Sequence, residues 1–194
     1  GHVNGIASTA LSRDRRWLVT ADAGEQSLLV VWNRHTAAPV RTIVDPHPYG
    51  VVACDITPDG KFIVTVSATA PVKANGEGDD DEDPGKDNTQ AIAVWNWTDA
   101  ERLQPICIGR IDDNDLQTTV TFNQWDVTEI ATNGKRRAFF WRWDRDAATK
   151  QPTSPSKELP PVPMQFYCPV LCPKDLSQRV GDFTMTIFMP NTSQ

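Results

Sequence analysis

The sequence has few of the side chains on which metal sites, disulfides and most catalytic centres depend: four cysteines and three histidines in 194 residues. The cysteines are Cys54, Cys107, Cys168 and Cys172. They form no Cys-x-x-Cys pair, and no histidine lies at metal-ligand spacing from them. We therefore expect free thiols, buried or idle in a reducing compartment, with no metal and no cofactor.

Long apolar runs are also missing. The longest, Leu28 to Trp32, is far shorter than the roughly 18 residues of a membrane helix. No charged stretch followed by an apolar run opens the chain, so the sequence shows no signal peptide. Because the first residue is Gly1 rather than methionine, we expect the chain to begin within a longer protein.

An excess of positive charge is absent too, since the formal net charge is -6. The segment from Glu77 to Asp87 holds seven acidic residues and one lysine, which accounts for the whole imbalance. The remainder is formally neutral, and a phosphate-binding surface needs clustered lysine and arginine. The composition therefore argues against nucleic acid as a partner, and the apolar pattern argues against a membrane.

What the sequence does contain is an internal repeat. An apolar segment that ends in tryptophan occurs three times, at Ser27–Trp32, Ala91–Trp95 and Ala138–Trp143. Each follows a turn signal and is rich in β-branched or aromatic residues, which predicts a short strand buried on both faces. A preceding strand is predicted in each repeat, at Trp17–Ala21, Phe62–Val66 and Glu129–Thr132. The turns before these strands also align, with Leu11–Arg16 matching Ile56–Lys61 and Val120–Asn123 entering the third turn.

An insertion lengthens the second repeat. Residues Pro71 to Thr89 are acidic, poor in apolar side chains and interrupted by glycine and proline, so we expect a disordered loop. Without it the period is near 44 residues, as in a four-stranded propeller blade of roughly 40 to 45 residues. Such blades carry the WD-repeat signature, here degenerate because Asn33 and Asn96 replace the closing aspartate.

The predicted fold class is therefore all-β, a partial WD-repeat β-propeller of about three blades plus the start of a fourth. We expect the three blades over residues 1–145, with the insertion at 71–89. A proline-rich connector of little regular structure follows at 146–175, and a further blade starts within 176–194, with Phe183–Phe188 as its opening strand. Three blades and one strand cannot close a ring, so we expect the remaining blades to come from elsewhere in the protein.

Polar residues recur at matching positions of the first two repeats. In WD repeats a histidine, a serine or threonine, an aspartate and the strand tryptophan can form a hydrogen-bonded chain that satisfies buried polar groups. The candidate structural sets are His2, Thr20, Asp22 and Trp32 in the first repeat, and His47, Thr65 and Trp95 in the second. The second set lacks its acidic member, and the third repeat lacks the histidine.

Catalytic and metal-binding motifs are not found. Two of the histidines have the structural role above, His35 lies in a turn, and no GxSxG, HExxH or phosphate-loop motif occurs. Asp79, Asp81 and Asp83 alternate as in a calcium loop, but Pro84 and Gln90 stand where that loop needs glycine and glutamate. The acidic run is thus interpreted as a solvated, flexible segment, or alternatively as a contact for a basic neighbour.

Two further features have similarly simple interpretations. The basic Lys135-Arg136-Arg137 follows Asn133-Gly134, a strong hairpin-turn pair, and predicts an exposed turn tip. Cys168 and Cys172 flank an apolar tripeptide in the connector and carry no recognisable motif. We expect no catalytic site in this chain.

Several longer segments resemble a known family, that of the cilia- and flagella-associated protein 251, WD-repeat proteins of motile cilia. The segments that carry the resemblance are Asp14–Gly24, Val30–Asn33, Pro39–Ile43, Ala93–Thr98, Thr119–Asn123, Val180–Thr184 and Ile187–Phe188. The motifs TADAG and VWNWT are more distinctive than a general WD signature. The similarity covers most of the chain except the acidic insertion and much of the connector.

The resemblance implies a function that the spacing alone does not. It implies a non-catalytic scaffold at the base of radial spoke three of the axoneme, which docks the spoke to the doublet microtubule and supports control of dynein-driven motility. The implied partners are radial spoke subunits and the calmodulin- and spoke-associated complex, with calmodulin as a further candidate. No binding residue is implied. The alternative is a WD-repeat adaptor in another assembly, such as a ubiquitin ligase or a ribosome-assembly complex.

Overall fold

The computed structural model describes residues 1–70, 89–146, 160–169 and 181–190, and its named elements are β-strands in three sheets. The predicted all-β class, a partial propeller, is confirmed. No helix in the described residues is long and apolar enough to cross a membrane. The acidic run Glu77–Asp87 lies outside the described residues, as does Cys172.

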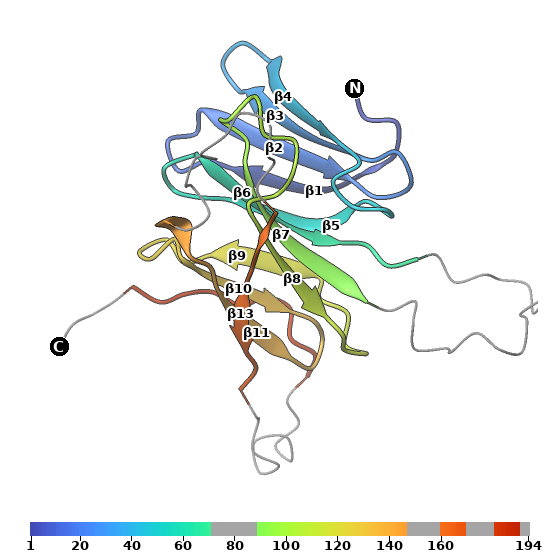
Figure 1. Cartoon of the computed structure of the whole chain (residues 1–194), viewed down its shortest axis with the longest axis vertical. Helices are drawn as coiled ribbons and strands as arrows, with labels where there is room; N and C mark the ends of the chain where they lie inside the picture. Colours follow the sequence, from blue (N-terminus) through green and yellow to red (C-terminus); the bar gives the residue numbers. More distant parts are fainter. Residues whose placement is uncertain (71–88, 147–159, 170–180, 191–194) are drawn as a thin grey trace, which may run out of the picture.

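Blade 1 is a four-stranded antiparallel sheet in chain order. It consists of β1 (Ile6–Leu11), β2 (Trp17–Asp22), β3 (Leu28–Asn33) and β4 (Ala38–Val44) (Figure 1). Its β1–β2 turn is held by side chains, because the Asp14 carboxylate accepts hydrogen bonds from the Ser12 hydroxyl and from the Arg16 N–H. These two hydrogen bonds lower the pKa of Asp14.

Blade 2 repeats this arrangement. Its four antiparallel strands are β5 (Val51–Ile56), β6 (Phe62–Ser67), β7 (Gln90–Asn96) and β8 (Cys107–Ile111). Thr57 and Asp59 form the same side-chain hydrogen bond in the β5–β6 turn as Ser12 and Asp14 form in blade 1, at 2.6 Å. Strands β6 and β7 pair directly with each other although residues 71–88, outside the described part of the chain, separate them in sequence.

Blade 3 takes its outer strand from the connector. Its strands are β9 (Thr119–Phe122), β10 (Glu129–Asn133), β11 (Ala138–Arg142) and β13 (Gln165–Tyr167). Another connector strand, β12 (Val162–Pro163), pairs in parallel with β8 of blade 2. The expectation of little regular structure is thus wrong at Val162–Pro163 and Gln165–Tyr167. The reason is that the outer edges of β8 and β11 offer unpaired backbone groups, which an extended proline-containing segment can satisfy.

The segment Phe183–Phe188 is irregular chain and not the opening strand that we expected. A strand forms only where a neighbouring strand pairs with its backbone, and the described residues supply no such neighbour for it. The backbone N–H of Phe183 instead donates to the carbonyl of Lys135, at 2.7 Å. A further blade within 176–194 stays a prediction.

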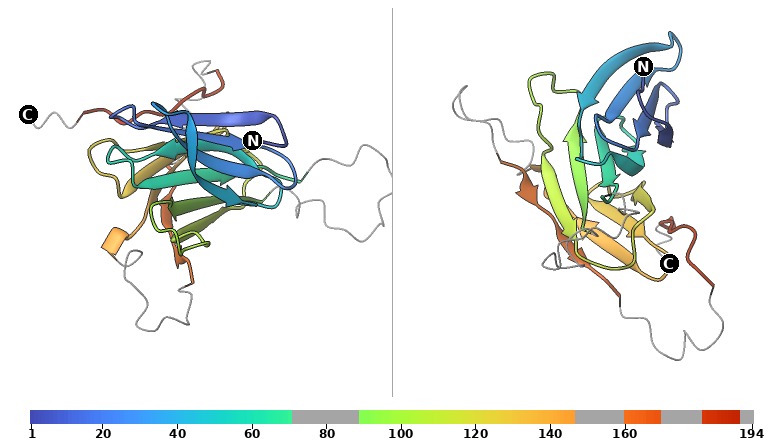
Figure 2. Two further views of the ribbon diagram at one scale, coloured as in Figure 1. Left: turned by 90° about the horizontal axis from the view of Figure 1, so that it is seen from above. Right: turned by 90° about the vertical axis from the view of Figure 1, so that its right-hand side faces the viewer.

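The three blades stack face to face with their first strands neighbouring one another, β1 beside β5 and β5 beside β9 (Figure 2). The apolar core lies in two layers between the sheets. The layer between blades 1 and 2 includes Val31, Ile63 and Trp95, and the layer between blades 2 and 3 includes Val64, Phe122 and Trp141. Blade 2 is thus apolar on both faces, as a blade inside a propeller must be.

Candidate functional site

The first predicted polar set comes together beside the β2–β3 turn. The Trp32 indole N–H donates to the Thr20 hydroxyl at 2.8 Å, and His2 Nε2 lies 2.6 Å from the same oxygen. His2 Nδ1 faces the fully buried Asp22 carboxylate at 3.2 Å. Asp22 also accepts hydrogen bonds from the backbone N–H groups of Asn4 and Leu28. The set therefore ties the start of the chain to the second and third strands of blade 1.

In blade 2 the corresponding set also comes together, without a carboxylate. His47 Nε2 lies 2.8 Å from the Thr65 hydroxyl, which accepts the Trp95 indole N–H at 2.9 Å. Ser67 occupies the strand position of Asp22, and its hydroxyl accepts the N–H of Ala91. Burial lowers the pKa of His47 to about 4, so this imidazole is neutral at physiological pH.

Blade 3 keeps the hydrogen bond between threonine and tryptophan but has no histidine, and an aspartate binds its β10–β11 turn instead. The Trp141 indole N–H donates to Thr132 at 3.1 Å. The Asp115 carboxylate accepts the backbone N–H groups of Lys135, Arg136 and Arg137 at 2.7 to 3.0 Å. This fixes the basic tip, whose three side chains are exposed as predicted for a hairpin turn. Asp115 thus holds the β10–β11 turn through backbone N–H groups, as Asp22 holds the β2–β3 turn through Leu28.

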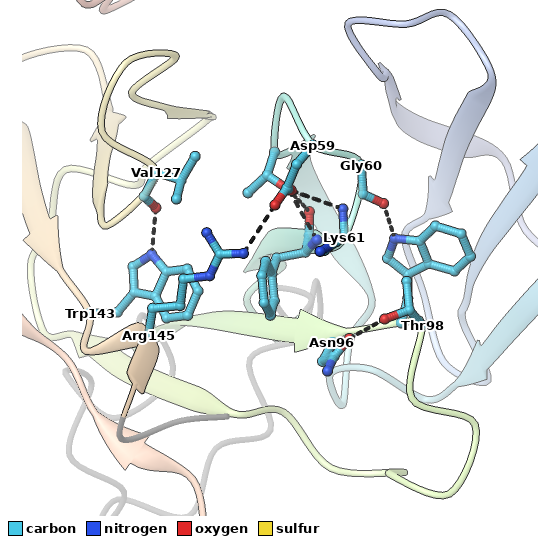
Figure 3. Close-up of polar contacts among 11 residues, drawn as sticks. Asp59, Gly60, Lys61, Asn96, Thr98, Val127, Trp143 and Arg145 are labelled. Carbon is cyan, nitrogen blue, oxygen red and sulfur yellow. Dashed lines mark hydrogen bonds and ion pairs between the residues drawn. The ribbon is translucent and has the colours of Figure 1, made fainter. Parts of the chain in front are cut away.

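Sequence reasoning aligned Trp143 with Trp32 and Trp95, but the structure gives that role to Trp141. It thereby missed a second use of tryptophan, in which two residues join neighbouring blades. Trp97 and Trp143, here called the wedge tryptophans, lie two positions after Trp95 and Trp141. The Trp97 indole N–H donates to the Gly60 carbonyl of its own blade at 2.8 Å (Figure 3). Its ring meets Trp17 of blade 1 edge to face, with centroids 5.1 Å apart.

The second wedge tryptophan repeats this geometry one blade further on. The Trp143 indole N–H donates to the Val127 carbonyl at 2.7 Å, and the ring meets Phe62 of blade 2 at 5.2 Å (Figure 3). The guanidinium of Arg145 lies over the Phe62 ring and pairs with Asp59 at 3.1 Å. The signal was present in the sequence as the repeated pattern Trp-x-Trp, but only the structure shows that the second ring crosses to another blade.

The first strands of the blades, β1, β5 and β9, carry further links between blades. The Asp55 carboxylate accepts the N–H of Phe122 at 2.8 Å, and the Ser8 hydroxyl accepts the N–H of Cys54 at 3.0 Å. Burial raises the pKa of Asp55, although the hydrogen bonds from Phe122 and Ile56 oppose this shift. Gln90 also joins blades 2 and 3, since its amide contacts the carbonyls of Ser67 and Gln117. The buried polar groups named here thus have structural partners.

The described residues offer little for catalysis or metal binding. They contain no group of three or more histidine, cysteine, aspartate or glutamate side chains that could hold a metal ion. Burial raises the pKa of the Cys54 thiol to about 11 and that of Cys107 to about 12, which keeps both protonated. Cys168 is a free thiol as well. The calcium-like aspartates Asp79, Asp81 and Asp83 lie outside the described residues.

The arrangement that remains is a rigid stack with loops at both ends of its strands. The turns that hold Lys61 and Lys135 lie at opposite strand ends, because one joins the first two strands of its blade and the other joins the second and third. Trp125 is an exposed aromatic residue in the β9–β10 turn. Such loops on a fixed scaffold are suited to contacts with other proteins.

Comparison with known proteins places this geometry in a family. A family model described as CFAP251 N-terminal domain matches residues 1–194. The chain is 33% identical over 205 residues to a cilia- and flagella-associated protein 251 from Chlamydomonas reinhardtii, and 36% over 197 residues to one from Tetrahymena thermophila. Both matches cover 100% of this chain, but only 22% and 16% of those proteins. A mouse relative with the same name is 28% identical over 97% of this chain and 12% of its own length.

Solved structures support the fold alone. The chain is similar to the β-propeller domain of Cps50 (Swd1) from Myceliophteria thermophila, with a TM-score of 0.54 and 11% identity over 92% of this chain and 43% of that one. A chain in the structure of the Mitotic Checkpoint Complex gives a TM-score of 0.54 and 14% identity, over 86% of this chain and 39% of its own length. In both cases this chain corresponds to less than half of the known chain.

Proposed function

The chain belongs to the CFAP251 N-terminal domain family, and on that premise we propose that it is a non-catalytic scaffold module of the axoneme in a motile cilium or flagellum. The observation that carries the proposal is the family match over the whole chain, together with relatives named for cilia and flagella. The chain spans less than a quarter of those relatives, so it supplies one part of the scaffold.

The finer assignment is a subunit at the base of a radial spoke. There the protein docks the spoke to the doublet microtubule and supports the regulation of dynein-driven motility. Its proposed partners are radial spoke proteins and subunits of the calmodulin- and spoke-associated complex, with calmodulin reached through that complex. A stack of blades joined by buried hydrogen bonds and aromatic wedges suits this role, because a docking subunit has to hold its shape under load.

Cross-linking of native axonemes tests both levels of the proposal. The described residues contain two exposed lysines, Lys61 and Lys135, at opposite ends of the strands. After detergent removal of the ciliary membrane, the full protein should stay with the axoneme. An amine-reactive reagent should then join at least one of these lysines to a spoke-base protein. The lysine that reacts identifies the end of the stack that faces the partner.

The matched controls are Lys61→Arg and Lys135→Arg, which keep the charge and remove the reactive amine. The cross-link to the spoke base should disappear in only the variant whose lysine faces the partner. Release of the protein with the detergent-soluble fraction would contradict the axonemal role. Cross-links only to ubiquitin-ligase or ribosome-assembly proteins would favour the adaptor alternative.

A further inference from the structure

Blade 3 has an open face that no described sheet covers. In Figure 1 blade 3 lies at the lower end of the stack, away from blade 1. A hollow of about 380 Å³ on this blade is lined by aromatic and charged side chains: Glu129, Phe140, Trp141, Arg142, Gln165, Phe166, Tyr167 and Phe188. Phe140 stacks on Tyr167 with ring centroids 5.9 Å apart, and Tyr167 is 63% exposed. Exposed aromatic surface of this kind marks a site that another element covers.

On this face a charged residue stands at the position where blades 1 and 2 have the aromatic residue that a wedge tryptophan contacts. Trp17 pairs with Asn33 across the strands, and Phe62 pairs with Asn96, in each case opposite the residue after the strand tryptophan. In blade 3 the same pairing joins Glu129 to Arg142. Glu129 therefore stands where blades 1 and 2 present an aromatic ring to the next blade. A tryptophan placed there would bury a carboxylate against an apolar ring, at a cost in desolvation.

Among the described residues, the ion pairs around Glu129 leave one negative charge unbalanced. Arg142 lies 3.7 Å from Glu129 and 3.5 Å from Asp126, so one cation faces two carboxylates. Asn123 donates a further hydrogen bond to Glu129 at 2.9 Å, which is neutral. A single additional cation on an aliphatic stem complements this surface, since its stem can lie on Phe140 while its head reaches Glu129.

The further blade expected from the sequence would cover this open face, and from this geometry we propose that it carries arginine or lysine where blades 2 and 3 carry a wedge tryptophan. Blade 1 shows that the wedge position accepts such a residue. Arg34 occupies it there, and its backbone N–H makes the same turn bond, to Arg16, that Trp143 makes to Thr128. The relatives extend far beyond the length of this chain, and Phe188 already contacts the open face at Phe140.

A charge-reversal experiment on the full-length polypeptide tests the proposal. The variant Glu129→Lys repels the proposed cation, so amide hydrogen exchange in β11 and β13 should rise at least tenfold. The variant also repels Arg142 within its own blade, which could raise hydrogen exchange without any further blade. It is therefore combined with a second substitution, in which the proposed basic wedge residue is replaced by glutamate. That second change lies in another blade and should restore slow exchange. The control Glu101→Lys, an exposed acidic residue of blade 2, should leave exchange in β11 and β13 unchanged.

Three outcomes would overturn the proposal. The first is an aromatic or acidic residue at the wedge position of the blade that covers Glu129. The second is failure of the reciprocal change to restore protection while Glu101→Lys behaves like the unaltered protein. The third is protection of β13 that depends on protein concentration, which would mean that a second copy covers the face.

Discussion

At the scale of single residues, Gly50 holds one of the tightest approaches between blades 1 and 2. Its φ is +84°, a conformation that favours glycine, and its backbone forms a bridge to Ala23. A Cβ built at this position would lie 2.6 Å from Ala23 Cα and from Gly24 N. Because these contacts are to backbone, the neighbours cannot move aside without shifting the turn.

Replacing Gly50 by alanine should therefore destabilise the propeller by about 2 kcal/mol or more, the sum of left-handed strain and overpacking. Urea denaturation of the propeller-bearing polypeptide measures the change in the free energy of unfolding. Gly5 is the control, since a Cβ there has no neighbour within 4 Å. Equal stability of Gly50→Ala and Gly5→Ala would show that the interblade turn is not packed as described.

His47 makes stability depend on pH in a defined window. Its pKa is about 4 in the folded protein, against an ordinary value of 6.5, because burial disfavours the charged imidazolium. Between these two values the unfolded chain binds more protons than the folded one, so stability is full above pH 6.5 and falls as the pH drops toward 4. At 1.36 kcal/mol per unit, the loss is about 3 kcal/mol.

The variant His47→Gln removes this titration and should flatten the stability profile between pH 6.5 and 4. Urea denaturation at several pH values measures it, with His35→Gln as the control because His35 is exposed in a turn. The difference between the profiles of the unaltered protein and His47→Gln isolates this group from Asp55, whose raised pKa acts in the opposite direction. If His35→Gln flattened the profile as much, burial of His47 could not be the cause.

At the scale of strands and turns, each wedge tryptophan is a link between blades that a single substitution can remove. Trp97→Ala should lower the free energy of unfolding by about 3 to 5 kcal/mol, as for other buried tryptophans. Trp97→Phe keeps most of the packing and loses only the hydrogen bond to Gly60, so it should lower the free energy of unfolding by about 1 kcal/mol. A double-mutant cycle with Trp17→Ala should give a coupling near 1 kcal/mol.

Chemical denaturation of the same polypeptide checks both values. Trp125→Ala is the control, because Trp125 is 52% exposed and should change the free energy of unfolding by no more than about 0.5 kcal/mol. Additive effects of Trp17→Ala and Trp97→Ala would contradict the edge-to-face contact between blades.

Sequence patterns could locate the two middle strands of each blade because these strands carry local signals. The segments that end in Trp32 and Trp95, and the strands that begin at Trp17 and Phe62, coincide closely with β3, β7, β2 and β6. The outer strands β12 and β13 could not be located in this way. Their partners β8 and β11 are distant in sequence, and a proline-rich stretch by itself favours an extended chain without saying what it pairs with.

In the candidate site, too, some features could be predicted from sequence patterns and others could not. Equal spacing from His2 to Ile6 and from His47 to Val51 was enough to group the polar sets, which the structure brings within hydrogen-bond distance. The wedge tryptophans recur as Trp-x-Trp, but the residue that each ring contacts is set only when the blades stack. Asp115 binds the backbone of the β10–β11 turn of its own blade, a contact between distant positions that no local pattern marks.

At the scale of the whole molecule, stability and function depend on the same feature, which is that each blade needs a neighbour on both faces. Blade 2 has both neighbours here, and its strand β6 is buried throughout. Blade 3 keeps an open face with exposed aromatic side chains. We therefore expect the three blades to act as one segment of a ring, which offers its turns to partners while its sheets stay covered.

The role proposed for this chain depends on its forming three consecutive blades of a propeller that is part of the axoneme. A density map of doublet microtubules from motile cilia would show these blades in place. We expect three stacked four-stranded sheets with this connectivity, continued by a further blade on the open face of blade 3, in a ring at the base of a radial spoke. A map in which these residues form a closed domain by themselves, or in which the protein is found away from the spokes, would contradict it.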